Sequence, residues 1–88
     1  MQLEILTPQK SVFSGEAKMI KVPGSKGSFE IMTNHAPIIS TLTDGELKVV
    51  TESGESLLYR TTAGVVEVKK NHVVILLETI VEEKNADK

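Results

Sequence analysis

The amino-acid sequence predicts an all-β protein, a two-sheet antiparallel β-sandwich of about ten short strands with no substantial helix. The first observation is composition, because Val, Ile and Thr account for 25 of the 88 residues. Their branched side chains are stiff at χ1 and favour pleated strands over helices. The second observation is spacing, because short apolar runs are separated by turn residues every 8–12 positions, as in sandwiches and barrels.

Each strand is identified by alternating or continuous apolar residues between turn residues. In the segment 28–32, for example, Phe29 and Ile31 point to one face of the strand and Glu30 points to the other. The continuously apolar run 73–77 predicts a strand that is covered on both faces or lies at the centre of the sandwich. The predicted strands cover residues 2–6, 16–22, 28–32, 38–42, 46–51, 57–62, 65–69 and 73–77.

Turn residues divide these strands. Ser14-Gly15 is predicted as a turn, and the segment 24–27, with two glycines, is predicted as a loop between strands. Asp44-Gly45 and the segments 52–55 and 70–72 are predicted as the turns of three hairpins.

Composition bounds the organisation and excludes several functions. Residues 1–81 are expected to form one β-sandwich domain, followed by a charged, flexible tail at 82–88. A net charge of −2 and only three aromatic residues argue against nucleic-acid binding. The lack of cysteine excludes disulfides, thiol catalysis and cysteine-zinc sites. No apolar run approaches the roughly 20 residues of a membrane span, and no targeting segment is visible.

A search for reactive constellations finds none, so no catalytic residue, metal or cofactor is expected. The sequence has no nucleophile turn, HExxH motif or Walker A loop. His35 and His72 have no carboxylate at metal-ligand spacing, and His72 is interpreted as a solvent-facing turn residue. Backbone N–H groups of the loop 24–27 could bind an anion, but a strand follows instead of a helix, which favours a plain turn.

The loop Asn34-His35-Ala36-Pro37 is unlike a generic turn. Pro37 restricts Ala36 to an extended conformation, and Asn34 tolerates unusual backbone angles. A rigid loop on a small scaffold is a common place for binding residues. A packed structural loop, with His35 hydrogen-bonded inside it, is an equally weighted alternative from the residues alone.

Four motifs occur in order along nearly the whole chain. Residues 3–15 read L-x-I-x-T-P-x-x-x-x-F-x-G, and residues 34–37 read N-H-A-P. Residues 63–68 follow the pattern G-G-x-x-E-V with Ala63 in place of the first glycine, and residues 71–78 approximate N-x-V-x-V-L-x-D. Together these motifs resemble the N-terminal sandwich domain of the epsilon subunit of bacterial F-type ATP synthases.

The resemblance implies a ten-stranded sandwich on the rotating central stalk, a non-catalytic subunit that couples ion flow to ATP synthesis. Its implied partners are the gamma subunit and the polar loops of the c ring, with no nucleic acid. It would meet the membrane only through the complex, at the cytoplasmic face of a bacterial cell membrane. The implied c-ring contact is Lys26, Gly27, Ser28, Phe29, Glu30, Ile31 and Met32, and the implied gamma-facing loop is Asn34, His35, Ala36, Pro37, Ile38 and Ile39.

The c-ring segment departs from the family pattern at one charged position. The acidic residue that often follows the glycine is replaced by Ser28. Glu30 is therefore the candidate anion of this segment, and Lys26 is the candidate cation. An exposed pair of this kind is worth roughly 0–1 kcal/mol.

Two other classes of function are weighed against this interpretation. One is a free-standing β-sandwich that binds a peptide or small molecule. The other is a small enzyme in which His35 and Glu30 form an acid–base pair, which requires both side chains within hydrogen-bond reach across a cleft. Nothing in the sequence supplies a nucleophile or a substrate pocket for the enzyme.

The tail carries a separate expectation. Many members of the family continue into two helices that can extend along gamma and block rotation, and this sequence lacks that helical hairpin. Residues 82–88 make under two turns at 3.6 residues per turn, and a helix that short is unstable alone in water. We therefore expect no inhibition by helix extension and no helical ATP site.

Overall fold

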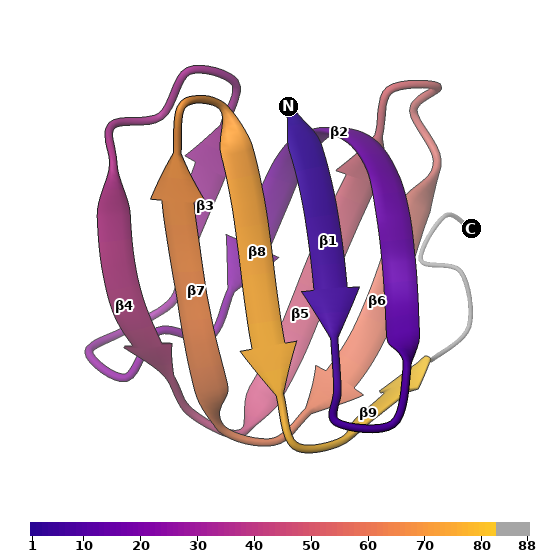
Figure 1. Cartoon of the computed structure of the whole chain (residues 1–88), viewed down its shortest axis with the longest axis vertical. Helices are drawn as coiled ribbons and strands as arrows, with labels where there is room; N and C mark the ends of the chain where they lie inside the picture. Colours follow the sequence, from indigo (N-terminus) through magenta and orange to yellow (C-terminus); the bar gives the residue numbers. More distant parts are fainter. Residues whose placement is uncertain (83–88) are drawn as a thin grey trace.

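A computed structural model describes residues 1–82 as two packed layers of strands (Figure 1). No helix occurs among these residues, and so none of them forms a helix long and apolar enough to cross a membrane. The all-β prediction is confirmed, with nine strands in this part of the chain where about ten were expected. The strands are β1 (Gln2–Leu6), β2 (Ser11–Val22), β3 (Phe29–Met32), β4 (Ile38–Leu42), β5 (Gly45–Thr51), β6 (Ser56–Thr61), β7 (Gly64–Lys69), β8 (His72–Leu77) and β9 (Ile80–Glu82).

The two layers share strand β2. Its first half pairs with β1 in the front sheet of Figure 1, whose order is β4-β7-β8-β1-β2. Its second half pairs with β3 and β5 in the rear sheet, which continues through β6 to β9. The ladders are antiparallel, as expected, except that β1 and β8 run parallel.

The predicted turn at Ser14-Gly15 is wrong. Both residues lie inside β2, where Ser14 pairs with Glu4 and Gly15 pairs with Leu3. The small polar residue is tolerated because Ser14 faces solvent from the front sheet. The ladder to β1 supplies the hydrogen bonds that a local turn would otherwise make.

A register irregularity between Ala17 and Met19 marks the place where β2 passes from one sheet to the other. An extra residue in one strand of a ladder bends that strand and shifts its alternation. Ala17, Ile20 and Val22 are consequently all fully buried. This spacing explains why simple alternation does not decide whether Met19 or Ile20 faces the core.

The core lies between the two sheets and consists of aliphatic side chains from both. Fully burying a Val, Leu or Ile side chain contributes about 1.5–3 kcal/mol, so this set is the main source of stability. The largest fully buried side chains are Leu3, Ile5, Ile20, Ile31, Leu47, Ile75, Val22, Val49, Val66 and Val73.

The predicted hairpin at Asp44-Gly45 is also wrong. Strand β4 pairs with β7 in the front sheet, whereas β5 pairs with β2 and β6 in the rear sheet. Thr43 and Asp44 therefore carry the chain across the sandwich. A two-residue turn signal is local, and it does not distinguish a hairpin from a crossing between sheets.

The other two predicted hairpins are confirmed. Residues 52–55 join β5 to β6, with Gly54 at a φ of 96°. Residues 70 and 71 join β7 to β8, and His72 is the exposed first residue of β8 instead of a turn residue. Strand β9 ends at Glu82, where we expected the tail to begin. Residues 83–88 of the predicted tail lie outside the described residues.

Candidate partner-binding surfaces

Two kinds of reactive group are at issue in the described residues, a metal site and the pair His35 and Glu30. Within residues 1–82, no three His, Cys, Asp or Glu side chains are grouped so as to hold a metal ion. His35 Nδ1 lies 2.7 Å from the carbonyl oxygen of Ala36, inside its own loop. No hydrogen bond or ion pair joins His35 to Glu30 in this part of the chain, so the structure gives the hypothetical acid–base pair no support.

The segment 26–32 comprises an exposed turn and strand β3. The turn is closed by the backbone, because the Gly27 N–H donates to the Gly24 carbonyl at 2.9 Å. A second backbone hydrogen bond connects the turn to β4, where the Ser25 N–H donates to the Thr41 carbonyl at 3.0 Å. Gly27 has a φ of 126°, a conformation that residues with a Cβ rarely adopt.

Only some residues of segment 26–32 are accessible. Ile31 is fully buried in the core and Phe29 packs against it, as the sequence alternation predicted. Glu30 and Met32 alternate with them on the outer face of the rear sheet, and Met32 is 52% exposed. The residues of this segment that a partner can reach are therefore Lys26, Gly27, Ser28, Glu30 and Met32.

Glu30 lies in a shallow groove of mixed charge on the rear sheet. It pairs across the ladder with Lys21, and Lys21 pairs on its other side with Lys48. All three face away from the core into a groove of about 750 Å³ that also includes Glu46 and Ser28. Both signs of charge are therefore presented side by side at this surface.

The segment 34–39 comprises the loop after β3 and the start of β4. The His35 N–H donates to the Met32 carbonyl at 3.0 Å, which closes a turn. Asn34 occupies the third position of this turn with a φ of 68°. A positive φ at this position alone is the signature of a type II turn, for which Asn is a common choice. The loop is thus locally ordered, as predicted from its residues.

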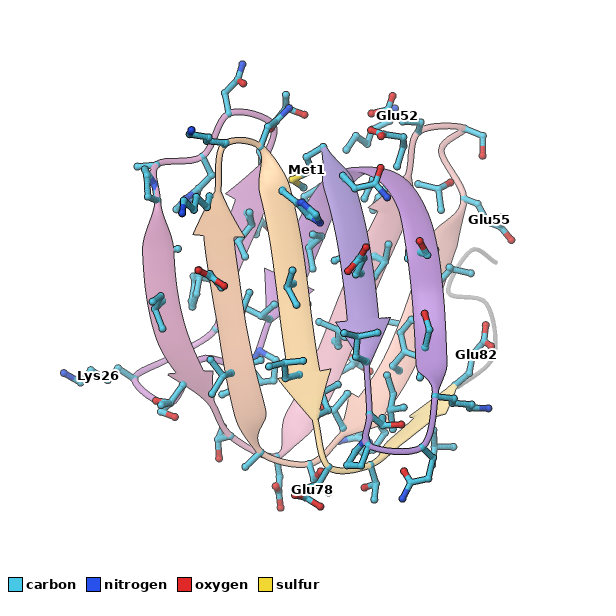
Figure 2. All side chains as sticks on the ribbon, in the orientation of Figure 1. Met1, Lys26, Glu52, Glu55, Glu78 and Glu82 are labelled. Atoms are coloured by element: carbon cyan, nitrogen blue, oxygen red, sulfur yellow. The ribbon has the colours of Figure 1, made fainter. Side chains whose placement is uncertain are left out.

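The two loops that flank β3, at residues 26–28 and 34–37, lie at opposite ends of the strand. In Figure 1 the loop before β3 is at the lower left and the loop after it is at the upper left. Figure 2 shows Lys26 extending from the lower loop, away from the body of the sandwich. The exposed turn at 26–28 and the loop 34–37 therefore do not form one continuous site, whereas Met32 lies at the same end of β3 as the loop 34–37.

The sequence reasoning missed an apolar surface on the outer face of the front sheet. Val65 pairs with Leu76, and Leu76 pairs with Leu6, so three apolar side chains lie in one row across β7, β8 and β1. Leu76 is 50% exposed. The row borders an open groove of about 590 Å³ that extends to Pro8.

Of the two alternatives predicted for the run 73–77, the structure supports a central strand, because β8 lies in the middle of the front sheet, and the exposed Leu76 excludes cover on both faces within the described residues. Val73, Ile75 and Leu77 are buried, whereas Leu76 is half exposed. Strongly apolar exposed faces mark interaction sites in soluble proteins. The continuous apolar run was thus a signal for this surface, although it was interpreted as burial within the chain.

Ile39, in segment 34–39, lies on the same face of the front sheet as this apolar row, although Thr41 is the β4 residue opposite Val65. Ile39 is 73% exposed and pairs with Glu67, so it belongs to the outer face of the front sheet. Ile38, by contrast, packs against the core. The outer face of the front sheet therefore includes one residue predicted for binding and several that were not.

Tyr59, on β6 away from both segments, is the titratable side chain whose environment matters most. It is 3% exposed, and burial raises the pKa of its hydroxyl group above the ordinary value near 10. Glu82, its partner on β9, and Glu55 raise this pKa further. The raised pKa of Tyr59 affects the stability of the folded protein at high pH, and it does not indicate a catalytic role.

Comparison with known proteins finds one family over nearly the whole chain. Residues 1–83 match the family described as "ATP synthase, Delta/Epsilon chain, beta-sandwich domain". The chain is similar to the ATP synthase epsilon chain 1 of Methylococcus capsulatus, with 37% identity over 87 residues. It is also similar to the ATP synthase epsilon chain of Alkalilimnicola ehrlichii, with 31% identity over 87 residues.

These curated relatives are longer than the chain. Each alignment covers 99% of this chain and 62% of the relative. The alignment with the ATP synthase epsilon chain of Protochlamydia amoebophila, at 35% identity, covers 89% of this chain and 53% of the relative. The similarity therefore concerns one part of those proteins.

Solved structures show the same fold. One similar chain is in a cryo-EM structure of the Euglena gracilis mitochondrial ATP synthase that contains OSCP, F1 and the c-ring. Its TM-score is 0.86 at 21% identity, over 91% of this chain and 51% of that chain. Another is in the Tetrahymena thermophila mitochondrial ATP synthase central stalk and c-ring, with a TM-score of 0.77 at 23% identity, over 92% of this chain and 65% of that chain.

Proposed function

The chain belongs to the family of ATP synthase delta/epsilon-chain β-sandwich domains, and from this premise we propose that it is a non-catalytic subunit of the central stalk of an F-type ATP synthase. Its role is to connect the gamma subunit to the c ring, so that ion flow is coupled to ATP synthesis. The match over residues 1–83 is the observation that carries this proposal. The names of the relatives, all ATP synthase epsilon chains, support it.

The accessible residues of segment 26–32 are assigned to the c ring. The polar loops of the c ring that carry both signs of charge are complementary to a surface of mixed charge. The groove on the rear sheet provides such a surface, because Lys21 and Lys48 lie beside Glu30. Lys26 extends from the adjacent turn (Figure 2). Each exposed ion pair contributes only about 0–1 kcal/mol, so this contact depends on several pairs acting together.

The gamma subunit is assigned to the other end of β3 and to the outer face of the front sheet. The turn at 32–35 presents a shaped loop, and Ile39 lies on the same outer face as the apolar row that contains Val65 and Leu76, in a separate row opposite Glu67. A subunit that remains attached during rotation needs a stable interface, and apolar burial supplies about 25 cal/mol per Å². The apolar face suits this long-lived partner better than the charged groove.

The location follows from these partners. The chain is peripheral, at the cytoplasmic face of a bacterial cell membrane, and it meets the membrane only through the complex. The partner surfaces are the gamma subunit and the c ring, and the catalytic sites belong to other subunits. The family match favours this function over a free-standing binding module.

A pull-down from native membranes tests the proposal. The tagged chain should retain gamma and the c subunit together, and a Leu76→Glu variant should lose gamma because it places a charge in the apolar row. A Val81→Glu variant, which places the same charge at an exposed apolar residue of β9 in the rear sheet, serves as the matched control. Recovery of neither subunit by the unmodified chain would refute the proposed function.

A further inference from the structure

Two turns that are far apart in sequence meet at one end of the sandwich. The Asn34 N–H donates to the side-chain Oδ1 of Asn71 at 2.8 Å, across 37 positions. Asn34 belongs to the loop after β3, and Asn71 belongs to the turn between β7 and β8 (Figure 1). The shape of the gamma-side loop, residues 34–37, is therefore tied to a residue outside it.

Asn71 is held firmly enough to act as an anchor. Lys70 and Asn71 have φ values of 51° and 63°, the pair of positive angles that defines a type I′ hairpin turn. The Asn71 carbonyl also accepts a hydrogen bond from the Gln2 N–H at 3.1 Å. The residue is thus fixed by β1 and by the hairpin before its side chain reaches the loop.

The hydrogen bond to Asn71 satisfies a backbone N–H group of the loop that has no acceptor within the loop. The His35 N–H is satisfied inside the loop by Met32, but the Asn34 N–H points out of the loop and its acceptor is Asn71. Without this acceptor the turn could still close on itself. Its angle relative to β7 and β8, and hence to the apolar face, would no longer be fixed.

We propose that Asn71 is a positioning residue for partner binding, whose side-chain amide holds the loop 34–37 in the orientation that the gamma subunit recognises. This inference rests on the proposed function for the identity of the partner, but the positioning itself does not. Asn71 need not touch gamma. It acts through its hydrogen bond with Asn34. A substitution of Asn71 therefore changes the position of the loop, although no residue of the loop itself is substituted.

The test uses two substitutions that both suit a positive φ. Asn71→Gly keeps the turn and removes the acceptor, whereas Asn71→Asp keeps an acceptor oxygen. One hydrogen bond shifts a local opening equilibrium by about a factor of ten. The hydrogen-exchange rate of the Asn34 amide should therefore rise about tenfold in Asn71→Gly. Affinity for gamma should fall by a similar factor, with both properties restored in Asn71→Asp.

Two controls separate the outcomes. Exchange at the core residue Ile75 reports global opening, and Lys70→Gly alters the same turn but leaves the acceptor in place. Unchanged Asn34 exchange in Asn71→Gly, or an equal rise at Ile75, would overturn the positioning role. Faster Asn34 exchange without any change in gamma affinity would show that Asn71 positions the loop. It would also overturn the assignment of this loop to gamma, and with it the role of Asn71 in binding.

Discussion

The two loops that flank β3 are both ordered, but by different means. The loop before β3 is shaped by glycines and backbone hydrogen bonds, with Gly24 packed against the following strand and Gly27 at a φ of 126°. The loop after β3 is also closed by a backbone hydrogen bond, from His35 to Met32, but its position depends in addition on side chains, through Pro37 and through the acceptor that Asn71 provides for the Asn34 N–H. A backbone-shaped loop leaves its side chains free to carry charge, whereas a side-chain-shaped loop presents a fixed surface.

This difference matches the two proposed partners. The c ring would present several equivalent polar loops, and exposed charges on a fixed backbone can pair with the loops that lie opposite them. An interface with gamma requires one shape. The two loops should therefore respond to different substitutions, and the following predictions use that difference.

The largest effect is expected for Gly24→Ala. A Cβ at this position would lie 2.6 Å from the Gly27 carbonyl oxygen and 2.8 Å from the Phe29 ring. Overpacking of this kind costs about 1–3 kcal/mol of unfolding free energy, which urea denaturation would measure. Gly15→Ala, where a Cβ would make only an ordinary contact at 3.5 Å with the Phe13 ring, is the control. A cost for Gly24→Ala no larger than that for Gly15→Ala would show that close packing does not shape this loop.

Pro37→Gly should separate binding from stability in the other loop. The free φ enlarges the unfolded ensemble and costs about 0.4–1 kcal/mol of stability. Gamma affinity should fall by more than this loss of stability implies, because the folded loop also becomes mobile. Calorimetric titration with gamma, together with thermal unfolding, measures both. Equal losses in binding and stability would mean that the loop is purely structural.

Glu30 should show the opposite separation. Glu30→Lys places a third lysine beside Lys21 and Lys48, and it should weaken coupling between ATP hydrolysis and proton pumping. Stability should change by less than about 1 kcal/mol because the site is exposed. Glu30→Gln removes the charge without reversing it and should have a smaller effect. Intact pumping in reconstituted vesicles that carry Glu30→Lys would show that this position was wrongly assigned.

Ionisation of the Tyr59 hydroxyl at high pH should lower the stability of the whole domain, and so it should affect both loops equally. The pKa of Tyr59 is raised by burial and by Glu82 and Glu55, so the folded state holds the hydroxyl proton more tightly than the unfolded state. Above pH 10 the unfolded state therefore loses the proton first, and stability falls as pH rises. Urea unfolding at several pH values should show this slope, and Tyr59→Phe should remove most of it. An unchanged slope in Tyr59→Phe would assign the loss to other groups.

The sequence predicted local features well and connections between distant elements poorly. The bounds of β1 and β4, the burial of Phe29 and Ile31 and two hairpin turns followed from alternation and turn residues. The predicted hairpin at Asp44-Gly45 failed because the partners of β4 and β5 are decided by packing between sheets. No local pattern indicates such a choice.

The candidate surfaces show the same limit. The unusual residues of the loop 34–37 were visible in the sequence, but its tie to Asn71 depends on two turns meeting in space. Likewise, the apolar run 73–77 was evident, yet only the ladder to Val65 and Leu6 shows that Leu76 forms an exposed row. Periodicity predicts which residues are apolar, and the fold decides which of them a partner can reach.

Hydrogen exchange in stages of assembly tests most directly whether the two ends of β3 serve different partners. Exchange would be compared for the isolated chain, its complex with gamma, and the complete enzyme with the c ring. We expect gamma to slow exchange in segment 34–39 and in β8, and the c ring to slow exchange at 26–28 only in the complete enzyme. Protection of both segments by gamma alone, or of neither in the complete enzyme, would contradict this account.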